Sequence, residues 1–179
     1  GLAEKTAKMA ANYELTASVV DMDGYDPASL VGAKRVLIIT STWGEGDMPD
    51  NAEDFWQNVN KSSPALAGVN YSVCAIGDSS YDEYCKAGVD WDNKFSALGA
   101  TSVQEIQLCD VDFDEPWTVW VNSVLPRIAC VDGAGVFQES LVEEMSAYGA
   151  GGDDTVSSGD FTPGTVLMDE ISVNIELFR

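Results

Sequence analysis

Apolar side chains gather in three short runs that are rich in β-branched residues, at residues 15–20, 36–40 and 71–76. Turn-forming residues follow each run. A run that is apolar at nearly every position is typical of a strand covered on both faces of a parallel sheet. Residues 103–108 alternate apolar and polar side chains, which predicts a strand near the rim. We therefore expect the first three strands inside a parallel sheet and the fourth close to its edge.

Helical patterns fill the intervals between these strands. The chain opens on a predicted helix at residues 2–11, and a second begins at Asp50, whose side chain forms a capping box with Glu53. A third helix ends at Gly99, and a fourth starts at Asp114. The apolar stripe of the fourth helix consists of Trp117, Trp120, Val121, Val124 and Ile128. Alternating strands and helices predict a doubly wound, three-layer α/β fold with right-handed crossovers.

The pattern changes after Arg127. A short amphipathic helix is predicted around residues 137–145, and residues 149–164 are rich in Gly, Ser, Asp and Pro, as linkers are. Residues 171–177 then alternate strictly between apolar and polar, which predicts a strand. Because we expect this strand to have no partner here, we interpret it as the start of another domain. We also expect the chain to be a segment of a longer polypeptide.

Charge and composition exclude several function classes. The 179 residues hold 9 Lys plus Arg against 30 Asp plus Glu, a net charge of −21, and no histidine. Such a chain repels nucleic-acid phosphates and anionic membranes. It has no imidazole base and no histidine ligand for zinc. Carboxylates, thiols or a bound cofactor must therefore carry any chemistry, and we expect no metal site.

The location of the protein is predicted from what its sequence lacks. No apolar run approaches the roughly 20 residues of a membrane span, and the first residues do not form a signal peptide. The four cysteines are widely spaced, which favours reduced, partly buried thiols over a metal cluster. We expect a soluble intracellular protein, with cytoplasm and organelle matrix both open.

Three loops follow predicted strands and concentrate chemically useful residues. They read STWGEGDMPDNAEDFW at residues 41–56, IGDSSYDEYC at 76–85 and LCDVDFDEPW at 108–117. Open α/β sheets bind ligands at the carboxyl ends of their strands, where these loops lie. Trp43 and Tyr81 stand on neighbouring loops and predict a slot for a planar ring.

These loops resemble the flavodoxin-like FMN domain of the diflavin reductases, which include NADPH-cytochrome reductases, the sulfite reductase flavoprotein and the reductase half of nitric oxide synthases. The same module occurs in pyruvate:NADP oxidoreductases. The resemblance extends from Gly1 to about Pro126 and rests on T-W-G-E-G-D-x-P-D-N-A followed by G-D-S-S-Y. It implies a flavodoxin-like sheet of strand order 2-1-3-4-5 with FMN at the switch point.

The resemblance also implies roles for individual residues. Trp43 and Tyr81 would flank the flavin ring, and the Gly44 carbonyl would face N5. Asp110 would lie beside the ribityl chain. No Lys or Arg occurs in the three loops, so nothing there stabilises an anionic reduced flavin. The implied cofactor-binding residues are Ser41, Thr42, Trp43, Gly44, Glu45, Gly46, Gly77, Asp78, Ser79, Tyr81, Tyr84, Cys85 and Asp110.

One part of the family pattern is missing. The first strand and its Ser/Thr-rich phosphate loop would stand before Gly1, so we expect them upstream in the parent polypeptide. The predicted organisation is a truncated FMN domain at residues 1–131, a linker with a possible short helix at 132–170, and the first strand of an FAD/NADP-binding reductase domain at 171–179.

The resemblance implies an electron-transfer module within an NADPH-linked oxidoreductase. Single electrons would pass between the FAD/NADP(H) domain of the same polypeptide and a second redox centre, either a haem protein or an iron–sulfur unit. A response-regulator receiver domain is excluded, because the required Asp and Lys are replaced by Ser41-Thr42 and Cys109-Asp110. A flavin-free flavodoxin fold serving as an interaction module remains the alternative.

Overall fold

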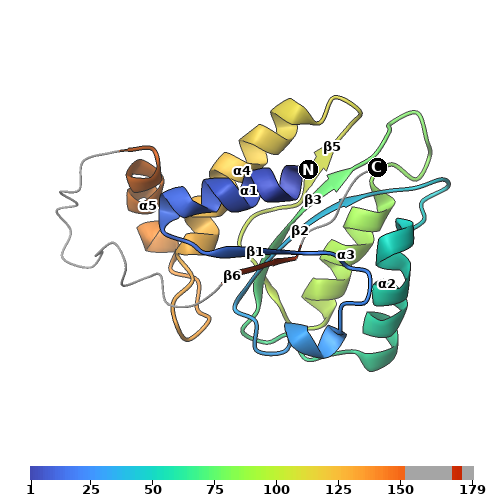
Figure 1. The fold of residues 1–179 in the computed structure, drawn as a ribbon, viewed down its shortest axis with the longest axis horizontal. Coiled ribbons are helices and arrows are strands. Elements are labelled where there is room, and N and C mark those ends of the chain that lie inside the picture. Colours follow the sequence, from blue (N-terminus) through green and yellow to red (C-terminus); the bar gives the residue numbers. More distant parts are fainter. Residues whose placement is uncertain (152–170, 175–179) are drawn as a thin grey trace.

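Two long parallel strands form the centre of the molecule. The computed structural model describes residues 1–151 and 171–174 (Figure 1). Strands β2 (Arg35–Ser41) and β3 (Asn70–Ile76) pair along their whole length, and every residue in both is buried. Two short strands, β4 (Thr101–Ser102) and β5 (Gln107–Cys109), pair in parallel with β3. These strands bring the three loops to one edge of the sheet.

A second pair of strands forms a separate two-stranded parallel sheet beside β2. Strand β1 (Ala17–Val20) pairs in parallel with β6 (Ile171–Asn174), with Ala17 opposite Ile171 and Val20 opposite Asn174. Strand β6 also lies next to β2, as Figure 1 shows. It therefore holds the place, between β1 and β2, of the strand that the sequence predicts to be missing.

Helices cover both faces of the sheet. On one face lie α1 (Leu2–Ala10), the 3-10 turn η1 (Ala11–Tyr13), α4 (Asp114–Ala129) and α5 (Val142–Gly149). On the other lie α2 (Asp50–Ser62) and α3 (Lys86–Ala97), with η2 (Pro27–Leu30) beside them; η3 (Glu139–Leu141) precedes α5. Each face has its own apolar core. The predicted three-layer α/β architecture is confirmed.

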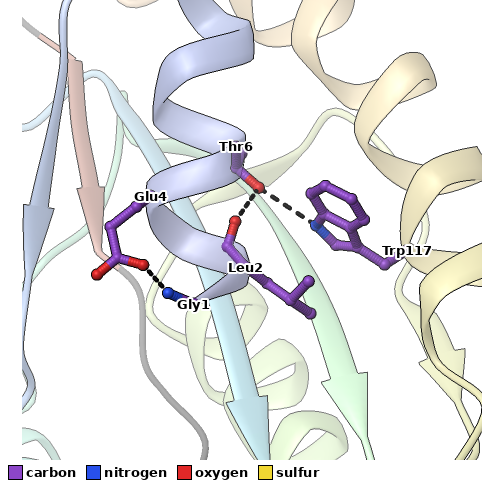
Figure 2. Close-up of polar contacts among 5 residues, drawn as sticks. All are labelled: Gly1, Leu2, Glu4, Thr6 and Trp117. Atoms are coloured by element: carbon purple, nitrogen blue, oxygen red, sulfur yellow. Dashed lines mark hydrogen bonds and ion pairs between the residues drawn. The ribbon is translucent and has the colours of Figure 1, made fainter.

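Helix α1 is fixed to α4 through a buried polar contact. The Thr6 hydroxyl donates to the Leu2 carbonyl at 2.9 Å and accepts from the Trp117 indole N–H at 3.2 Å (Figure 2). At the start of the helix, the Gly1 amino group pairs with the Glu4 carboxylate. Thr6 is fully buried, so its hydroxyl satisfies the indole donor where water cannot reach.

Most predicted helices are confirmed, and the capping details are wrong. The opening helix, the end of α3 before Gly99 and the buried stripe of α4 all appear as expected. However, α2 and α4 begin at Asp50 and Asp114 themselves, with Pro49 and Phe113 in the N-cap positions, so neither aspartate caps through its side chain. Both carboxylates instead lie in the first turn, where the helix dipole favours negative charge.

Two strand predictions are also wrong. The run at residues 15–20 was expected inside the sheet, yet β1 pairs only with β6 among the described residues, and Ser18 and Val19 are exposed. A strand with a neighbour on one side alone is not fully covered. The strand expected at 103–108 is interrupted, because the chain turns between Ser102 and Gln107 and gives two short strands instead of one.

In the carboxyl-terminal part, one prediction is confirmed and another is wrong. The predicted short helix is confirmed as α5, and its Met145 is fully buried in the core that α1 and α4 share. The expectation that the last strand has no partner in this chain is wrong for Ile171–Asn174, which pairs with β1. Residues 152–170, the second half of the predicted linker at 132–170, and residues 175–179 lie outside the described residues. The assignment of the last strand to a following domain stays a prediction.

None of the helices described in residues 1–151 combines the length and the apolar character that crossing a bilayer requires.

Candidate functional site

A cavity of about 390 Å³ opens at the edge of the sheet where β2, β3 and β5 end. This volume falls within the range of small-molecule sites. All three loops singled out in the sequence contribute to its wall. The lining residues are Ser41, Thr42, Trp43, Gly44, Ile76, Gly77, Asp78, Tyr81, Glu83, Tyr84, Cys85, Val111 and Phe113.

The loop after β2 turns sharply on two glycines. The Trp43 and Asp47 backbones exchange hydrogen bonds of 3.0 and 2.8 Å, which closes a tight turn. Gly44 and Gly46 inside it have φ angles of +50° and +106°, a region that residues with a Cβ rarely adopt. A Cβ at Gly46 would also lie 2.8 Å from the Glu83 Cβ. The glycines therefore let the first loop lie close against the second.

Thr42 ties this loop to the start of α3. Its backbone N–H donates to the Ile76 carbonyl at 2.9 Å, and its hydroxyl accepts from the Ala87 backbone N–H at 3.0 Å. Ala87 is in the first turn of α3, where backbone N–H groups have no partner within the helix. The threonine side chain thus satisfies a buried helix donor and holds two walls of the cavity together.

The second loop returns on itself between Gly77 and Cys85. A Cβ at Gly77 would lie 2.7 Å from the Cys85 backbone nitrogen, so only glycine fits. Cys85 itself has a φ of +56° and is fully buried. Burial raises the pKa of its thiol to about 11, so the group is neutral near pH 7. Cys85 is therefore an uncharged wall of the cavity, and not an activated nucleophile.

Aromatic and apolar side chains at the cavity mouth are unusually open to solvent. Trp43 is 40% exposed, Tyr81 52% and Val111 62%. Large apolar groups that are exposed together mark binding sites more often than chance positions on a surface do. The two aromatic rings come from different loops, as the predicted slot requires.

The electrostatics of the cavity are acidic. Asp78 and Glu83 are among its lining residues, and none of the lining residues is cationic. Lys86, next to the second loop, forms an ion pair with Asp90. The hydrogen bond from its ammonium group to Asp90 raises the lysine pKa. The lysine that directly follows the second loop is therefore already engaged along α3.

One buried polar group at the cavity lacks a partner. Ser41, the last residue of β2, is 6% exposed, and its hydroxyl makes no hydrogen bond to any part of the chain that the structure describes. An unsatisfied buried hydroxyl is costly and is normally paired. Because Ser41 lines the cavity, a bound ligand can supply the missing partner.

The structure brings together nine of the thirteen residues predicted from the sequence: Ser41, Thr42, Trp43, Gly44, Gly77, Asp78, Tyr81, Tyr84 and Cys85. Glu45, Gly46, Ser79 and Asp110 lie outside the lining. Asp110 instead bonds to Ser79 on the neighbouring loop.

Four lining residues were missed from the sequence: Ile76, Glu83, Val111 and Phe113. A signal for two of them existed. Val111 and Phe113 alternate with aspartates in the third loop, so an apolar face could have been expected there.

Comparison with known proteins places this geometry in context. A family model described as flavodoxin matches residues 1–119. The sulfite reductase [NADPH] flavoprotein alpha-component of Bacillus subtilis is 36% identical over 126 residues, which cover 70% of this chain and 21% of that protein. The corresponding protein of Vibrio vulnificus is 32% identical over 152 residues, which cover 84% of this chain and 25% of that protein. The chain therefore spans only a fifth to a quarter of the length of these curated relatives.

Solved structures show the same fold. A flavodoxin mutant from Pseudomonas aeruginosa superposes with a TM-score of 0.62 at 25% identity, covering 69% of this chain and 86% of that one. Oxidised flavodoxin 1 from Bacillus cereus superposes with a TM-score of 0.56 at 26% identity, covering 68% and 85% respectively.

Proposed function

This chain belongs to the flavodoxin family, and we propose that it is an FMN-carrying module that passes single electrons within a larger NADPH-linked flavoprotein oxidoreductase. The cofactor of the flavodoxin domain is FMN. The similarity to sulfite reductase flavoproteins supports a role in electron transfer. The observation that carries the proposal is the cavity at the carboxyl edge of the sheet, with its two exposed aromatic side chains.

The residues present fit FMN. The cavity has the size of a small-molecule site and is lined by residues of all three loops. The unpaired Ser41 hydroxyl offers a hydrogen bond to a polar ligand. Gly77 leaves no room for a side chain, so the backbone itself borders the cavity there. A flat heteroaromatic ligand with a polar chain matches this combination of apolar faces and hydrogen-bonding groups.

Individual residues would hold the cofactor as follows. Trp43 and Tyr81 would flank the flavin ring, and the loop of Thr42, Gly44, Glu45 and Gly46 would border its N5 edge. Gly77, Asp78 and Ser79 would contact the pyrimidine edge. Tyr84 and Cys85 would form the inner wall together with Ser41. When bound, the flavin supplies redox chemistry that takes up or releases electrons singly or in pairs.

The chain tunes this chemistry through charge. Asp78 and Glu83 line the cavity without a lysine or arginine among the lining residues, so added negative charge on a bound ring is disfavoured. A neutral thiol at Cys85 adds no charge of either sign. The protein environment therefore favours forms of the ring that gain a proton with each electron.

Electron exchange needs a ligand edge that partners can approach. Trp43, Tyr81 and Val111 line the cavity and are exposed, so this side of the site is open to a partner. In the proposed parent protein one partner is an FAD/NADP(H)-binding reductase domain, and the other is a haem protein or an iron–sulfur unit. The net charge of −21 favours a basic docking surface on at least one of them.

A titration tests the proposal directly. FMN is added to a purified chain that is extended upstream of Gly1 through the predicted first strand and phosphate loop, and flavin fluorescence and visible absorption are followed. We expect quenched fluorescence and a shifted visible spectrum, because aromatic rings would lie against the flavin. If this extended chain shows helical far-UV circular dichroism but takes up no FMN, the proposal is refuted and the alternative, a flavin-free interaction module, is favoured.

Variants identify the site within the same assay. Trp43→Ala and Tyr81→Ala remove the two exposed rings, and each is expected to weaken FMN binding by about tenfold, since an aromatic stack contributes about 1 kcal/mol or more. Val119→Ala is the control, because Val119 is also 62% exposed but lies on α4 outside the cavity lining. Equal affinities for the Tyr81 and Val119 variants would remove Tyr81 from the site.

A further inference from the structure

The second and third loops of the site are joined by one carboxylate. Asp110 directly follows β5, and its Oδ1 accepts from the Ser79 backbone N–H at 3.0 Å and from the Val111 backbone N–H at 2.8 Å. Its Oδ2 accepts from the Ser79 hydroxyl. Both oxygens are therefore used, and Ser79 is held through its backbone and its side chain together.

These contacts lie next to the cavity in the chain and outside its lining. Asp110 and Ser79 are not lining residues, although their chain neighbours Asp78 and Val111 are. The Gly77 backbone N–H also donates to the Cys109 carbonyl at 2.9 Å, which aligns the two loops from their first residues. The carboxylate thus joins two loops whose other residues face the cavity.

The opposite end of the second loop has a separate tie. Thr42 accepts from Ala87 at the start of α3, immediately after this loop. The second loop, which carries Tyr81, is therefore fixed to the third loop at one end and to the first loop at the other. Tyr81 lies between the two ties and is itself 52% exposed. Its position relative to Trp43 depends on both.

We propose that Asp110 is a positioning residue: it fixes the loop that carries Tyr81 against the third loop, and so sets the width of the ring slot, without contacting the ligand. This inference rests on the proposed function, because it assigns how the FMN site is held. It is an alternative to the role beside the ribityl chain that the family resemblance implies for Asp110. Hydrogen bonds to an ionised acceptor are stronger than neutral ones, which suits a clamp at a partly exposed position.

The charge and the geometry of the clamp are separable by substitution. Asp110→Ala removes all three hydrogen bonds. Asp110→Asn keeps an oxygen for the two backbone donors and can donate to the Ser79 hydroxyl, which also accepts. Asp112→Ala is the matched control, because this aspartate stands two residues away, is exposed, and makes no side-chain hydrogen bond within the described chain. Loss of charge near the site is then the same in the control.

The experiment measures FMN affinity by fluorescence and the visible circular dichroism of the bound flavin for all four proteins, each extended upstream of Gly1 as in the titration above. We expect about tenfold weaker binding and reduced visible dichroism for Asp110→Ala. Asp110→Asn is expected to restore both within about threefold, and Asp112→Ala to match the parent chain. Restoration by asparagine distinguishes a hydrogen-bonded clamp from a requirement for charge.

Amide hydrogen exchange of residues 77–81 gives a readout that needs no flavin. In the absence of FMN, Asp110→Ala should accelerate exchange at Ser79 and its neighbours, whereas Asp112→Ala should not. Failure of the parent chain to take up FMN would refute the proposed function alone, and the exchange data would still decide the clamp. Unchanged exchange in Asp110→Ala overturns the clamp, and weaker FMN binding without faster exchange would instead mean direct contact with the ligand.

Discussion

A close contact between α3 and β3 makes a quantitative prediction about how the site is supported. A Cβ built at Gly88 would lie 2.2 Å from the Ala75 Cβ and 3.0 Å from the Ala75 Cα. The optimal separation of non-bonded carbon atoms is about 3.5–4.0 Å, so Gly88→Ala forces α3 and β3 apart by about 1.3 Å. Neither group can rotate away, because both atoms are attached directly to the backbone.

Two opposing effects set the size of the change. Replacing glycine by alanine in a helix gains about 1 kcal/mol at most, and less in the first turn, where Gly88 lies. Overpacking costs about 1–3 kcal/mol, and the rigid contact favours the upper end of that range. We therefore expect Gly88→Ala to lower the free energy of unfolding by about 2 kcal/mol, which corresponds to a fall in Tm of about 4–8 °C.

Urea unfolding followed by far-UV circular dichroism checks this value, and a double variant supplies the control. Ala75→Gly alone loses a methyl group and adds a flexible strand residue, so it should also destabilise. In Ala75→Gly/Gly88→Ala the methyl group moves across the contact, so the double variant should be more stable than Gly88→Ala alone, although both parent substitutions destabilise. The reasoning fails if Gly88→Ala is as stable as the parent chain, or if the double variant is no more stable than Gly88→Ala.

Three further predictions concern pH, thiol chemistry and the last strand. Hydrogen bonds from the Ser79 hydroxyl and backbone, and then from Val111, lower the Asp110 pKa, so its contribution to stability is complete above the ordinary aspartate pKa of about 4 and is lost as the pH falls through the lower folded value. Acid unfolding should therefore lower the stability of Asp110→Asn less than that of the unsubstituted chain, and an equal loss of stability would contradict this. Burial raises the Cys85 pKa to about 11, so iodoacetamide should label this thiol slowly in native protein at about pH 8 and quickly in urea. Mass spectrometry locates the label, and rapid labelling of Cys85 in native protein would refute the burial argument. A chain that ends at Gly151 lacks β6, so β1 loses the partner it has in the structure, and urea unfolding should show lower stability than for the full chain. Equal stability of the two chains would mean that the β1–β6 pairing does not stabilise the fold.

The helices and the location of the site could be predicted because their determinants are local. The buried stripe of α4, with Trp117 and Trp120, follows the 3.6-residue period of a helix, and this period is visible in the sequence. Loops after parallel strands must meet at one edge, so Trp43 and Tyr81 were expected on neighbouring walls without any knowledge of distances. Exact helix starts depend on one or two residues, and Asp50 shows how a capping pattern can shift by one position.

Strand neighbours could not be predicted in the same way. The apolar side chains of residues 15–20 predict a strand, but the burial of that strand depends on the elements next to it. Among the described residues, β1 pairs with β6 alone. The pairing joins Ala17 to Ile171, positions separated by most of the chain. No local period encodes such a partner, because the hydrogen bonds of a ladder are made by backbone groups that every residue carries.

The role of Asp110 shows a similar limit within the site. Its position after a strand correctly brought it to the edge of the sheet, but a carboxylate there can either face a ligand or bond to a neighbouring loop. The choice depends on where the Ser79 N–H points, which follows from the turn of the second loop and not from the identity of Asp110. The same turn requires glycine at Gly77, because the Cys85 backbone passes 2.7 Å from the place of a Cβ. The shape of the second loop therefore determines which carboxylate oxygens are already engaged. Both Asp110 oxygens accept hydrogen bonds from the chain, whereas at Asp78, which lines the cavity, the bonds from the Ser80 backbone N–H and hydroxyl go to Oδ1.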